Sequence, residues 1–396
     1  MDAVQQQVPV IQPASRFGDV AEYYFSRKLR EIAQMQQEGK QVLNLGIGSP
    51  DLPPAPAVIE TLNAHSLRAD THAYQSYSGI PELRKAFADW YRQWMQVELD
   101  PQSEVLPLMG SKEGIMHISM TYLEPGDQVL VPDPGYPAYA AVGKLTGAEV
   151  VTYTLKESLG WQADLEELSQ RDLSRVKIMW LNYPNMPTGA QADSKYFERL
   201  VALAQQHQFL LVNDNPYTFI LNDQPQSILS VPGAKAVALE LNSLSKAHNM
   251  AGWRIGMVAG ASAYLQQILR FKSNMDSGMF KPMQLAAVQA LGQPASWYDS
   301  LNAVYRERRV LAEDILRSLG CSFDPAQVGM FVWAKTPDRY PSGYELTDQV
   351  LETAHVFLTP GGIFGEAGKP YVRISLCSDV SVLKEAKDRI EKMITP

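Results

Sequence analysis

Cysteine is scarce in this sequence of 396 residues, which has only Cys321 and Cys377. Two cysteines cannot form a framework of disulfides, so we expect a reducing compartment. The six histidines show no spacing typical of a metal site, and no metal is expected. Lys and Arg number 35 against 43 for Asp and Glu, a formal net charge of −8. An acidic chain without a dense basic run is a poor candidate for a nucleic-acid-binding protein.

Long apolar runs are absent as well. No run approaches the ~20 residues that a membrane-spanning helix needs. The start, MDAVQQQVPV, has neither the basic region nor the apolar core of a secretory signal. We therefore expect a cytoplasmic protein without a membrane partner. Hydrophobic residues make up 45% of the chain and charged residues 20%, which excludes a disordered chain and a coiled coil.

Short β-rich runs alternate with helical ones in the middle of the chain. The runs are 128–132, 149–155, 177–182, 209–214, 236–242 and 254–260, and several are almost wholly apolar. Strands that are covered on both faces have this composition, as in a parallel sheet. A helical segment at 193–207 lies between two of them. The pattern predicts an α/β fold with a mostly parallel central sheet flanked by helices.

The two ends of the chain differ from this middle region. Helical spacing of apolar residues predicts a helix at 20–37 and a long helical stretch at roughly 283–318, followed by the strands FVWAK and YVRISLC. The length suits two domains, the second a smaller α+β domain. The predicted divisions are a mobile arm at 1–15, an N-terminal segment at 16–50 that joins the small domain, a large domain at 51–282 and a small C-terminal domain at 283–396.

Polar side chains follow the predicted strands. In an open α/β sheet, ligands bind beyond the carboxyl ends of the strands, where such side chains converge. The residues in these positions are Tyr136, Asn182, Asn185, Asp214, Tyr217, Ser243, Ser245 and Lys246, and Arg254 is expected to begin the next strand.

Lys246 lies in the segment SLSKAHNMAGWRIG. A lysine in a loop is most often a solvated surface residue. Its neighbours indicate more, because Ser243, Ser245 and Arg254 together make a cationic, donor-rich pocket that suits a phosphate. A desolvated lysine near another cation can have a lowered pKa and form a Schiff base with an aldehyde.

The same segment resembles the lysine motif of fold-type I pyridoxal-phosphate enzymes, specifically the class I/II aminotransferases. Further segments stand in that family's order over nearly the whole chain: YQSYSGIPELRKAF, MGSKEGI, PDPGYPAY, NYPNMPTGA, NDNPYTFI and YVRIS. The resemblance implies a pyridoxal 5'-phosphate enzyme that moves the amino group of an L-amino acid to a 2-oxo acid, such as 2-oxoglutarate or pyruvate. It also implies a homodimer with shared active sites.

The resemblance assigns roles around the cofactor ring. Lys246 would form the Schiff base and then move the proton between the substrate α-carbon and the cofactor. Asp214 would pair with the pyridine nitrogen and keep it protonated. Tyr217 would hydrogen-bond the phenolic oxygen, and Tyr136 would stack on the ring. Tyr139 is expected to be a packing residue.

Other matched positions concern the phosphate and the substrate. Ser111 and Lys112 begin a helical run, where unsatisfied N–H groups favour phosphate. The phosphate cup would be completed by Ser243, Ser245 and Arg254. Arg373 would hold the substrate α-carboxylate, with the backbone of Ile47 and Gly48 beside it. Tyr74 would reach the phosphate of the neighbouring subunit.

One motif departs from the family pattern. The family usually reads Asn-Pro-Thr-Gly, whereas Met186 precedes Pro-Thr-Gly in this chain. The usual asparagine donates to the phenolic oxygen, and methionine cannot donate. Either Asn185 or Asn182 substitutes, or Tyr217 serves that oxygen alone. Compensation by Asn185 is the favoured hypothesis.

Several other functions compete with transamination. A cysteine-S-conjugate β-lyase or a synthase of the same fold would use the same lysine and cofactor. An aminotransferase-like effector domain would need a DNA-binding module, and fewer than 50 residues precede the first motif. Ser243 to Lys246 also fits S-x-x-K, but the later K-T-G of those enzymes is missing. GIGS does not open a helix after a strand, so no dinucleotide site is expected.

Overall fold

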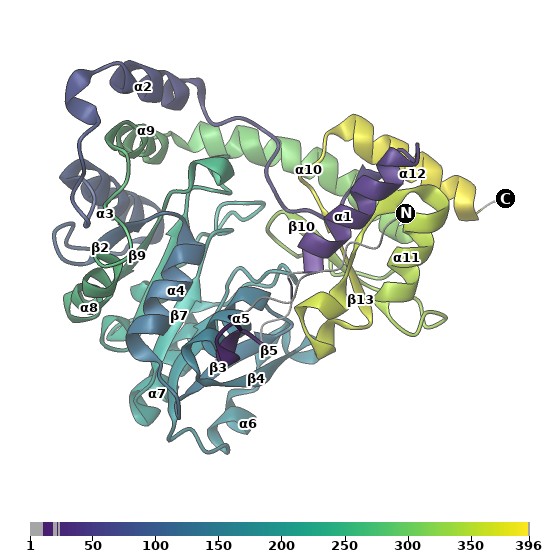
Figure 1. Ribbon diagram of the computed structural model, residues 1–396. Helices are drawn as coiled ribbons and strands as arrows, with labels where there is room; N and C mark the ends of the chain where they lie inside the picture. The colour runs from purple at the N-terminus through teal and green to yellow at the C-terminus, as the bar shows by residue number, and fades with distance from the viewer. Residues whose placement is uncertain (1–10, 19–21, 23, 395–396) are drawn as a thin grey trace.

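The computed structural model describes residues 11–18, 22 and 24–394. Most of the predicted mobile arm at 1–15 and the first residues of the predicted 20–37 helix lie outside this described part. Two lobes are visible (Figure 1). The larger lobe holds a wide sheet with helices around it, and the smaller lobe combines α1 (Tyr24–Gln37) with the C-terminal elements.

The central sheet has eight strands in the order β2-β9-β8-β7-β6-β3-β4-β5. Neighbours from β8 to β4 pair in parallel, which confirms the predicted mostly parallel sheet. The strands are β2 (Val105–Leu108), β3 (Gln128–Asp133), β4 (Glu149–Lys156), β5 (Gln162–Ala163), β6 (Val176–Leu181), β7 (Leu210–Asp214), β8 (Ala238–Ser243) and β9 (Gly256–Gly260).

Strand β9 runs antiparallel to both of its neighbours, β8 and β2. The connection from β8 to β9 contains only the short 3-10 helix η6 (Ala251–Trp253). A parallel return needs a longer crossover, usually a full α-helix, so the chain turns back beside β8 instead. Arg254 was expected to begin this strand, but it lies before it with a left-handed φ of 57°.

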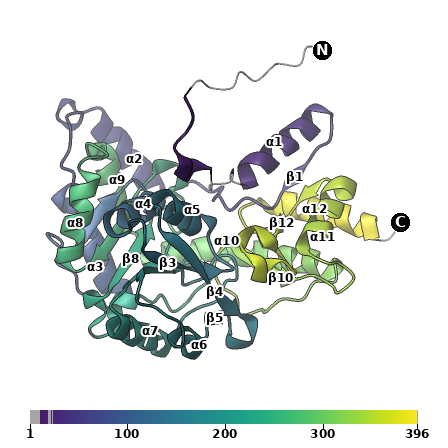
Figure 2. The same ribbon diagram turned by 60° about the horizontal axis from the view of Figure 1, so that its bottom comes forward.

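Helices cover both faces of the sheet (Figure 2). Val129 and Val131 of β3 belong to one buried cluster, together with side chains of α4 (Ser111–Tyr122), α5 (Pro137–Thr146) and α8 (Ser262–Lys272). Leu130, between them, belongs to the cluster on the opposite face, which includes α3 (Pro81–Met95) and α7 (Ser194–His207). Successive strand residues point to opposite faces, and both faces are buried along β3, β6, β7 and β8, so most residues of these strands are apolar, whereas β4 is more exposed.

The predicted helical stretch at 283–318 is two helices. α9 (Lys281–Leu291) packs against α2 (Pro56–Ser66) and α3, and α10 (Ala295–Ser318) extends towards the smaller lobe (Figure 1). Gly292 and Pro294 separate them. Proline lacks an N–H and its ring clashes with the preceding turn, so it begins a new helix rather than continuing one.

The smaller lobe contains a three-stranded antiparallel sheet, β10 (Phe331–Lys335), β13 (Tyr371–Ser375) and β12 (Thr359–Pro360), in that order. Strand β1 (Leu43–Asn44) pairs in parallel with β11 (Val356–Phe357) and ties the N-terminal segment to this lobe. The predicted domain boundaries stay predictions.

The remaining helices are α6 (Leu165–Ser169), α11 (Gly343–Ala354), α12 (Val380–Ile394), and the 3-10 helices η1 (Ser15–Phe17), η2 (Ala69–Thr71), η3 (Glu157–Leu159), η4 (Ile228–Ser230), η5 (Ala234–Ala236), η7 (Gly361–Phe364) and η8 (Glu366–Gly368).

Within the described ranges, every helix is too short or too polar to span a lipid bilayer.

Candidate active site

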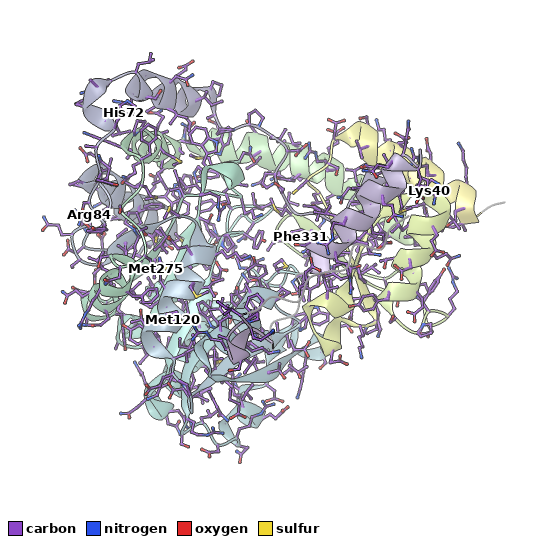
Figure 3. All side chains as sticks on the ribbon, in the orientation of Figure 1. Lys40, His72, Arg84, Met120, Met275 and Phe331 are labelled. Atoms are coloured by element: carbon purple, nitrogen blue, oxygen red, sulfur yellow. The ribbon has the colours of Figure 1, made fainter. Side chains whose placement is uncertain are left out.

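A cavity of about 450 Å³ collects residues from both lobes. Its larger-lobe walls follow the carboxyl ends of β3, β6, β7 and β8, as the open-sheet rule requires. Figure 3 places Phe331, one of its small-lobe residues, between the two lobes. Most of the residues singled out from the sequence line this cavity: Ile47, Gly48, Ser111, Lys112, Tyr136, Asn182, Asp214, Tyr217, Ser243, Ser245, Lys246, Arg254 and Arg373.

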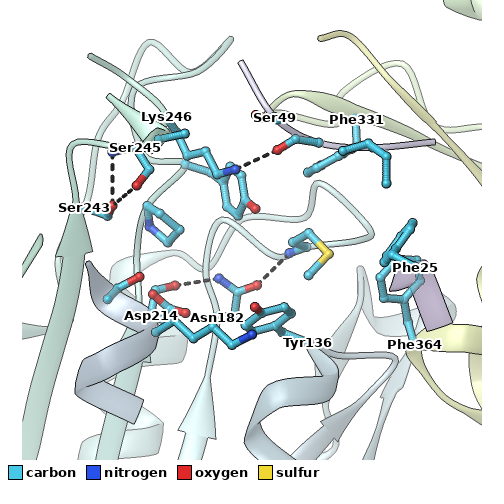
Figure 4. Close-up of a pocket in the computed structure, with 18 of the residues that line it drawn as sticks. Phe25, Ser49, Tyr136, Asn182, Asp214, Ser243, Ser245, Lys246, Phe331 and Phe364 are labelled. Atoms are coloured by element: carbon cyan, nitrogen blue, oxygen red, sulfur yellow. Dashed lines mark hydrogen bonds between the residues drawn. The ribbon is translucent and has the colours of Figure 1, made fainter. Parts of the chain in front are cut away.

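Lys246 projects from the loop after β8 into the cavity (Figure 4). Its Nζ donates to the backbone oxygen of Gly48 at 2.7 Å and lies 5.8 Å from the centre of the Tyr217 ring. Burial lowers the pKa of Lys246, and the charges of Arg373 and Arg254 lower it further. The amine is therefore easier to deprotonate than a solvated lysine, as a nucleophile or a base requires.

Asp214 ends β7 at the floor of the cavity. Its Oδ2 accepts a hydrogen bond from the hydroxyl of Tyr139 at 3.0 Å, whereas Oδ1 is buried and has no partner in the described part of the chain. Burial raises the pKa of Asp214 to about 7, against the opposing effect of the Tyr139 hydrogen bond. A buried acceptor beside a cavity suits a ligand that brings an N–H donor, and a cationic donor would stabilise the carboxylate.

Tyr139 is a functional candidate that the sequence reasoning treated as packing alone. Its ring does pack, stacked on Trp180 with centroids 5.0 Å apart. Its hydroxyl, however, orients Asp214. The available signal was its spacing from Tyr136, because residues three apart share one face of a helix.

The start of α4 forms one end of the cavity. Ser111 is the first helical residue after Gly110, whose φ is 85°. The guanidinium of Arg254 lies so close to Gly110 that a Cβ there would overlap Nη2. Ser243 and Ser245 lie beside it, with their hydroxyls 2.7 Å apart. Helix N–H groups, hydroxyls and a guanidinium together fit a phosphate group.

Arg373 lies at the opposite end, on β13, and is 4% exposed. Its Nη2 donates to the backbone oxygen of Gly46 at 2.8 Å, and its Nη1 contacts Sδ of Met186 at 3.2 Å. The ring centres of Phe331 and Phe364 lie 3.9 and 4.7 Å from the guanidinium carbon. These contacts hold a planar cation that can take a carboxylate with two parallel hydrogen bonds.

The asparagines of the NYPNMPTG segment differ in position. Asn182 lines the cavity, but its Nδ2 donates to the backbone oxygen of Asp214 at 2.5 Å and its Oδ1 accepts from the backbone N–H of Met186. Asn185 is not among the lining residues, and its Oδ1 accepts from the hydroxyl of Thr188. Met186 itself faces the cavity. The donor of Asn185, Nδ2, is buried and has no partner in the described part of the chain, so compensation by Asn185 stays a prediction.

Tyr74 is also outside the cavity. It lies in the loop between η2 and α3 and is 90% exposed. Its predicted role in a neighbouring subunit stays a prediction.

A polar cluster outside the cavity was not visible from histidine spacing. Ligand-type atoms of Glu113, His117 and Asp276 lie within 4.8 Å of one another, and Lys272 pairs with Asp276 at 2.8 Å. Asp276 comes from a distant segment, so only the packing of α8 on α4 reveals the group. The ammonium of Lys272 compensates the carboxylate of Asp276, so the cluster is a buried ion-pair network.

Comparisons with known proteins agree with this geometry. Residues 40–390 match the model of the family described as aminotransferase class I and II. An LL-diaminopimelate aminotransferase of Moorella thermoacetica is 39% identical over 97% of this chain and 99% of its own length. A relative of the same name from Desulforudis audaxviator is 40% identical over 95% and 96% of the two chains.

Solved structures give the same result. Substrate-bound BacF of Bacillus subtilis superposes with a TM-score of 0.92 and 35% identity, covering 97% of this chain and 98% of BacF. A mutant of Thermus thermophilus aspartate aminotransferase superposes with a TM-score of 0.88 and 26% identity, covering 96% and 99%. The family match spans most of the chain, and so this protein belongs to the class I and II aminotransferases, which are pyridoxal-phosphate-dependent enzymes of fold type I.

Proposed function

We propose that the cavity binds pyridoxal 5'-phosphate and that the chain transfers the amino group of an L-amino acid to a 2-oxo acid, 2-oxoglutarate or pyruvate. The observation that carries the proposal is the convergence of Lys246, Asp214 and Arg373 on one cavity with a phosphate-type cup at its far end. The names of the relatives make LL-diaminopimelate a candidate amino donor.

The residues fit this cofactor. Its phosphate matches the cup of Ser111, Ser243, Ser245 and Arg254, with Lys112 on the same first turn of α4. The unpartnered Oδ1 of Asp214 matches a ring N–H. When bound, the cofactor supplies an aldehyde carbon for the amino group and a ring that withdraws electrons from the substrate α-carbon.

Each of these side chains would then have a separate role in the reaction. Arg373 holds the substrate carboxylate and so fixes the α-carbon near Lys246. Lys246, with its lowered pKa, removes the proton from the substrate α-carbon and delivers it to the cofactor. Asp214 keeps the ring nitrogen protonated, and Tyr136 lies along the cavity wall where it can stack on the ring.

Trapping and mapping test the proposal directly. The purified holoprotein, reduced with borohydride and digested, should carry the pyridoxyl group on Lys246. Lys246→Ala should carry none and should show no amino transfer. A pyridoxyl group on another lysine would contradict the assignment. Transfer of the amino group to the 2-oxo acid, rather than release of ammonia and pyruvate from a cysteine conjugate, separates transamination from the β-lyase alternative.

We infer that two copies form a dimer in which Tyr74 of one chain approaches the cofactor phosphate of the other. Aminotransferases of this family are typically dimeric, and Tyr74 is exposed and does not line the cavity of its own chain. The cytoplasmic location stays a prediction.

A further inference from the structure

We propose that the preferred amino donor carries a large uncharged apolar side chain, aromatic or aliphatic, rather than a side-chain carboxylate or ammonium. This inference rests on the proposed function and names its substrate class. It differs from what the names of the relatives would suggest, because diaminopimelate has a charged group at both ends.

The cavity has two chemically different ends (Figure 4). Ser243 and Ser245 mark the phosphate-type end, and Phe331 and Phe364 gather at the other end together with Phe25. We call the second end the apolar mouth and define it by Phe25, Leu29, Ile47, Phe331 and Phe364. A substrate held by Arg373 has its side chain near this mouth, because two of these phenyl rings flank the same guanidinium.

The apolar mouth is built from three separate elements. Phe25 and Leu29 project from α1, one helical turn apart, so they share a face. Phe331 begins β10 and meets the Tyr217 ring edge-on at 5.9 Å. Phe364 ends η7 and packs edge-on against Trp333 at 6.0 Å. Rings fixed by such contacts form an apolar surface, and an apolar substrate side chain that covers it binds favourably because both lose contact with water.

Every cation that lines the cavity already has another role, so none is left to pair with a charged substrate side chain at the apolar mouth. Lys246 is at the reacting centre, Arg254 and Lys112 are at the start of α4, and Arg373 takes the α-carboxylate. Asp214 is the lining carboxylate, at the floor of the cavity. Among the described residues, no further acidic or basic side chain lines the cavity.

The basic residues next to Phe25 on α1 face elsewhere. Arg27 lies over the ring of Tyr24 at 5.8 Å, and Lys28 pairs with Glu31 and Asp348. Neither lines the cavity. A distal carboxylate or ammonium would therefore lose water against phenyl rings without gaining a counter-charge from this chain, which is costly.

A half-reaction series tests the inference. The holoenzyme is mixed with L-phenylalanine, L-leucine or L-methionine, and with L-glutamate, L-aspartate, L-lysine or LL-diaminopimelate, and the change in cofactor absorbance is followed. We expect the best apolar donor to exceed every charged donor at least about tenfold in kcat/KM. A faster reaction with a charged donor would place a counter-charge from outside this chain at the mouth and overturn the inference. No conversion with any amino acid would instead overturn the proposed function.

Binding of unreactive acids gives a readout that does not depend on turnover. We expect 3-phenylpropionate to perturb the cofactor absorbance at a concentration at least about tenfold lower than glutarate does. The reverse order would refute the apolar mouth even if catalysis were absent.

A designed charge supplies the matched control. Leu29 is 42% exposed and lines the mouth, so Leu29→Arg places a cation there without burying it. Leu159 is 44% exposed on η3 and does not line the cavity, so Leu159→Arg adds the same charge elsewhere. We expect Leu29→Arg to shift the preference towards glutarate and L-glutamate by about tenfold, and Leu159→Arg to leave it unchanged. An unchanged preference in Leu29→Arg would show that the mouth does not select the side chain.

Discussion

The carboxyl group of Asp214 makes the stability of the apoprotein depend on pH. Burial raises its pKa from the ordinary 3.8 to about 7. Between about pH 4 and 7 the folded chain keeps a proton that the unfolded chain has released, so stability falls as the pH rises through this range and is constant above it. The full loss corresponds to about 4 kcal/mol. We expect Asp214→Asn apoprotein to lack this component in unfolding measurements between pH 4 and 8.

The difference between wild type and Asp214→Asn isolates this group from other titrating residues. Equal pH dependence in the two apoproteins would show that Asp214 ionises normally. Loading the wild type with pyridoxal phosphate should flatten its profile, because a cationic ring nitrogen favours the carboxylate.

Met186 lines the cavity where the family usually has an asparagine donor, so we expect one donor fewer around the cofactor's phenolic oxygen. Asn185 does not line the cavity, so we expect Tyr217 to act without a second side-chain donor. A restored donor of the charge-assisted kind contributes roughly 1.5–3 kcal/mol, or about one to two pH units. Met186→Asn should lower the midpoint of the cofactor's spectral pH titration by that amount.

Asn185→Ala is the matched comparison for Met186→Asn. It should leave the titration midpoint nearly unchanged, although loss of the Thr188 hydrogen bond can lower thermal stability. A large shift in Asn185→Ala with none in Met186→Asn would show that Asn185 moves in and compensates for the methionine.

At the scale of elements, Asp133 joins the two lobes beside the cavity. Its carboxylate, at the end of β3, accepts from the backbone N–H groups of Glu366 and Ala367 at 3.2 and 3.1 Å. These groups open η8, directly after Phe364 and Gly365. The backbone N–H of Gly135 also donates to the oxygen of Phe364 at 2.8 Å. The contact therefore positions one wall of the apolar mouth relative to the sheet.

Removing this carboxylate should loosen substrate binding. We expect Asp133→Ala to raise the KM for the amino donor about tenfold, equivalent to ~1.4 kcal/mol, with little change in cofactor affinity. Asp133→Asn keeps one acceptor oxygen and should show a smaller rise. Steady-state kinetics with a cofactor-binding titration separate the two effects. An unchanged KM in Asp133→Ala would mean that the contact does not position Phe364.

At the scale of the whole molecule, the exposed aromatic loop points to assembly. Tyr74 and Tyr77 are 90% and 45% exposed, and the nearby Phe280 ring lies 5.7 Å from His72. Gly278 packs tightly on the backbone of this loop, and Met275 is 58% exposed. His72 and Met275 lie on the same outer side of the larger lobe (Figure 3). Such a group of apolar side chains is typical of a protein interface.

Complementation tests the shared site. Lys246→Ala and Tyr74→Glu chains should each be inactive alone, the second because a carboxylate repels the phosphate. Mixed dimers contain one intact site in two, so an equal mixture should regain up to about a quarter of wild-type activity. Absence of recovery in dimers that demonstrably exchange subunits would place Tyr74 outside the partner's site, and a monomer in solution would remove the shared site altogether.

Some features of this protein could be predicted from local sequence alone. The strand runs β3, β6, β7 and β8 are largely apolar because both faces of the sheet are covered there, and this composition is visible without a structure. The cavity residues that follow these strands were predicted for the same reason, since the carboxyl ends of parallel strands meet at one edge.

Other features depend on contacts between distant segments. The hydrogen bond from the Tyr139 hydroxyl to Asp214 joins two residues that are 75 positions apart, a spacing that carries no signal in the sequence. The apolar mouth combines residue 25 with residues 331 and 364. The family and the mostly parallel sheet were thus predictable from short motifs and apolar strand runs, and the candidate reacting side chains remain predictions drawn from the same motifs. The three phenyl rings around Arg373 could not be predicted, because Phe25, Phe331 and Phe364 meet only when the two ends of the chain pack together in the folded protein.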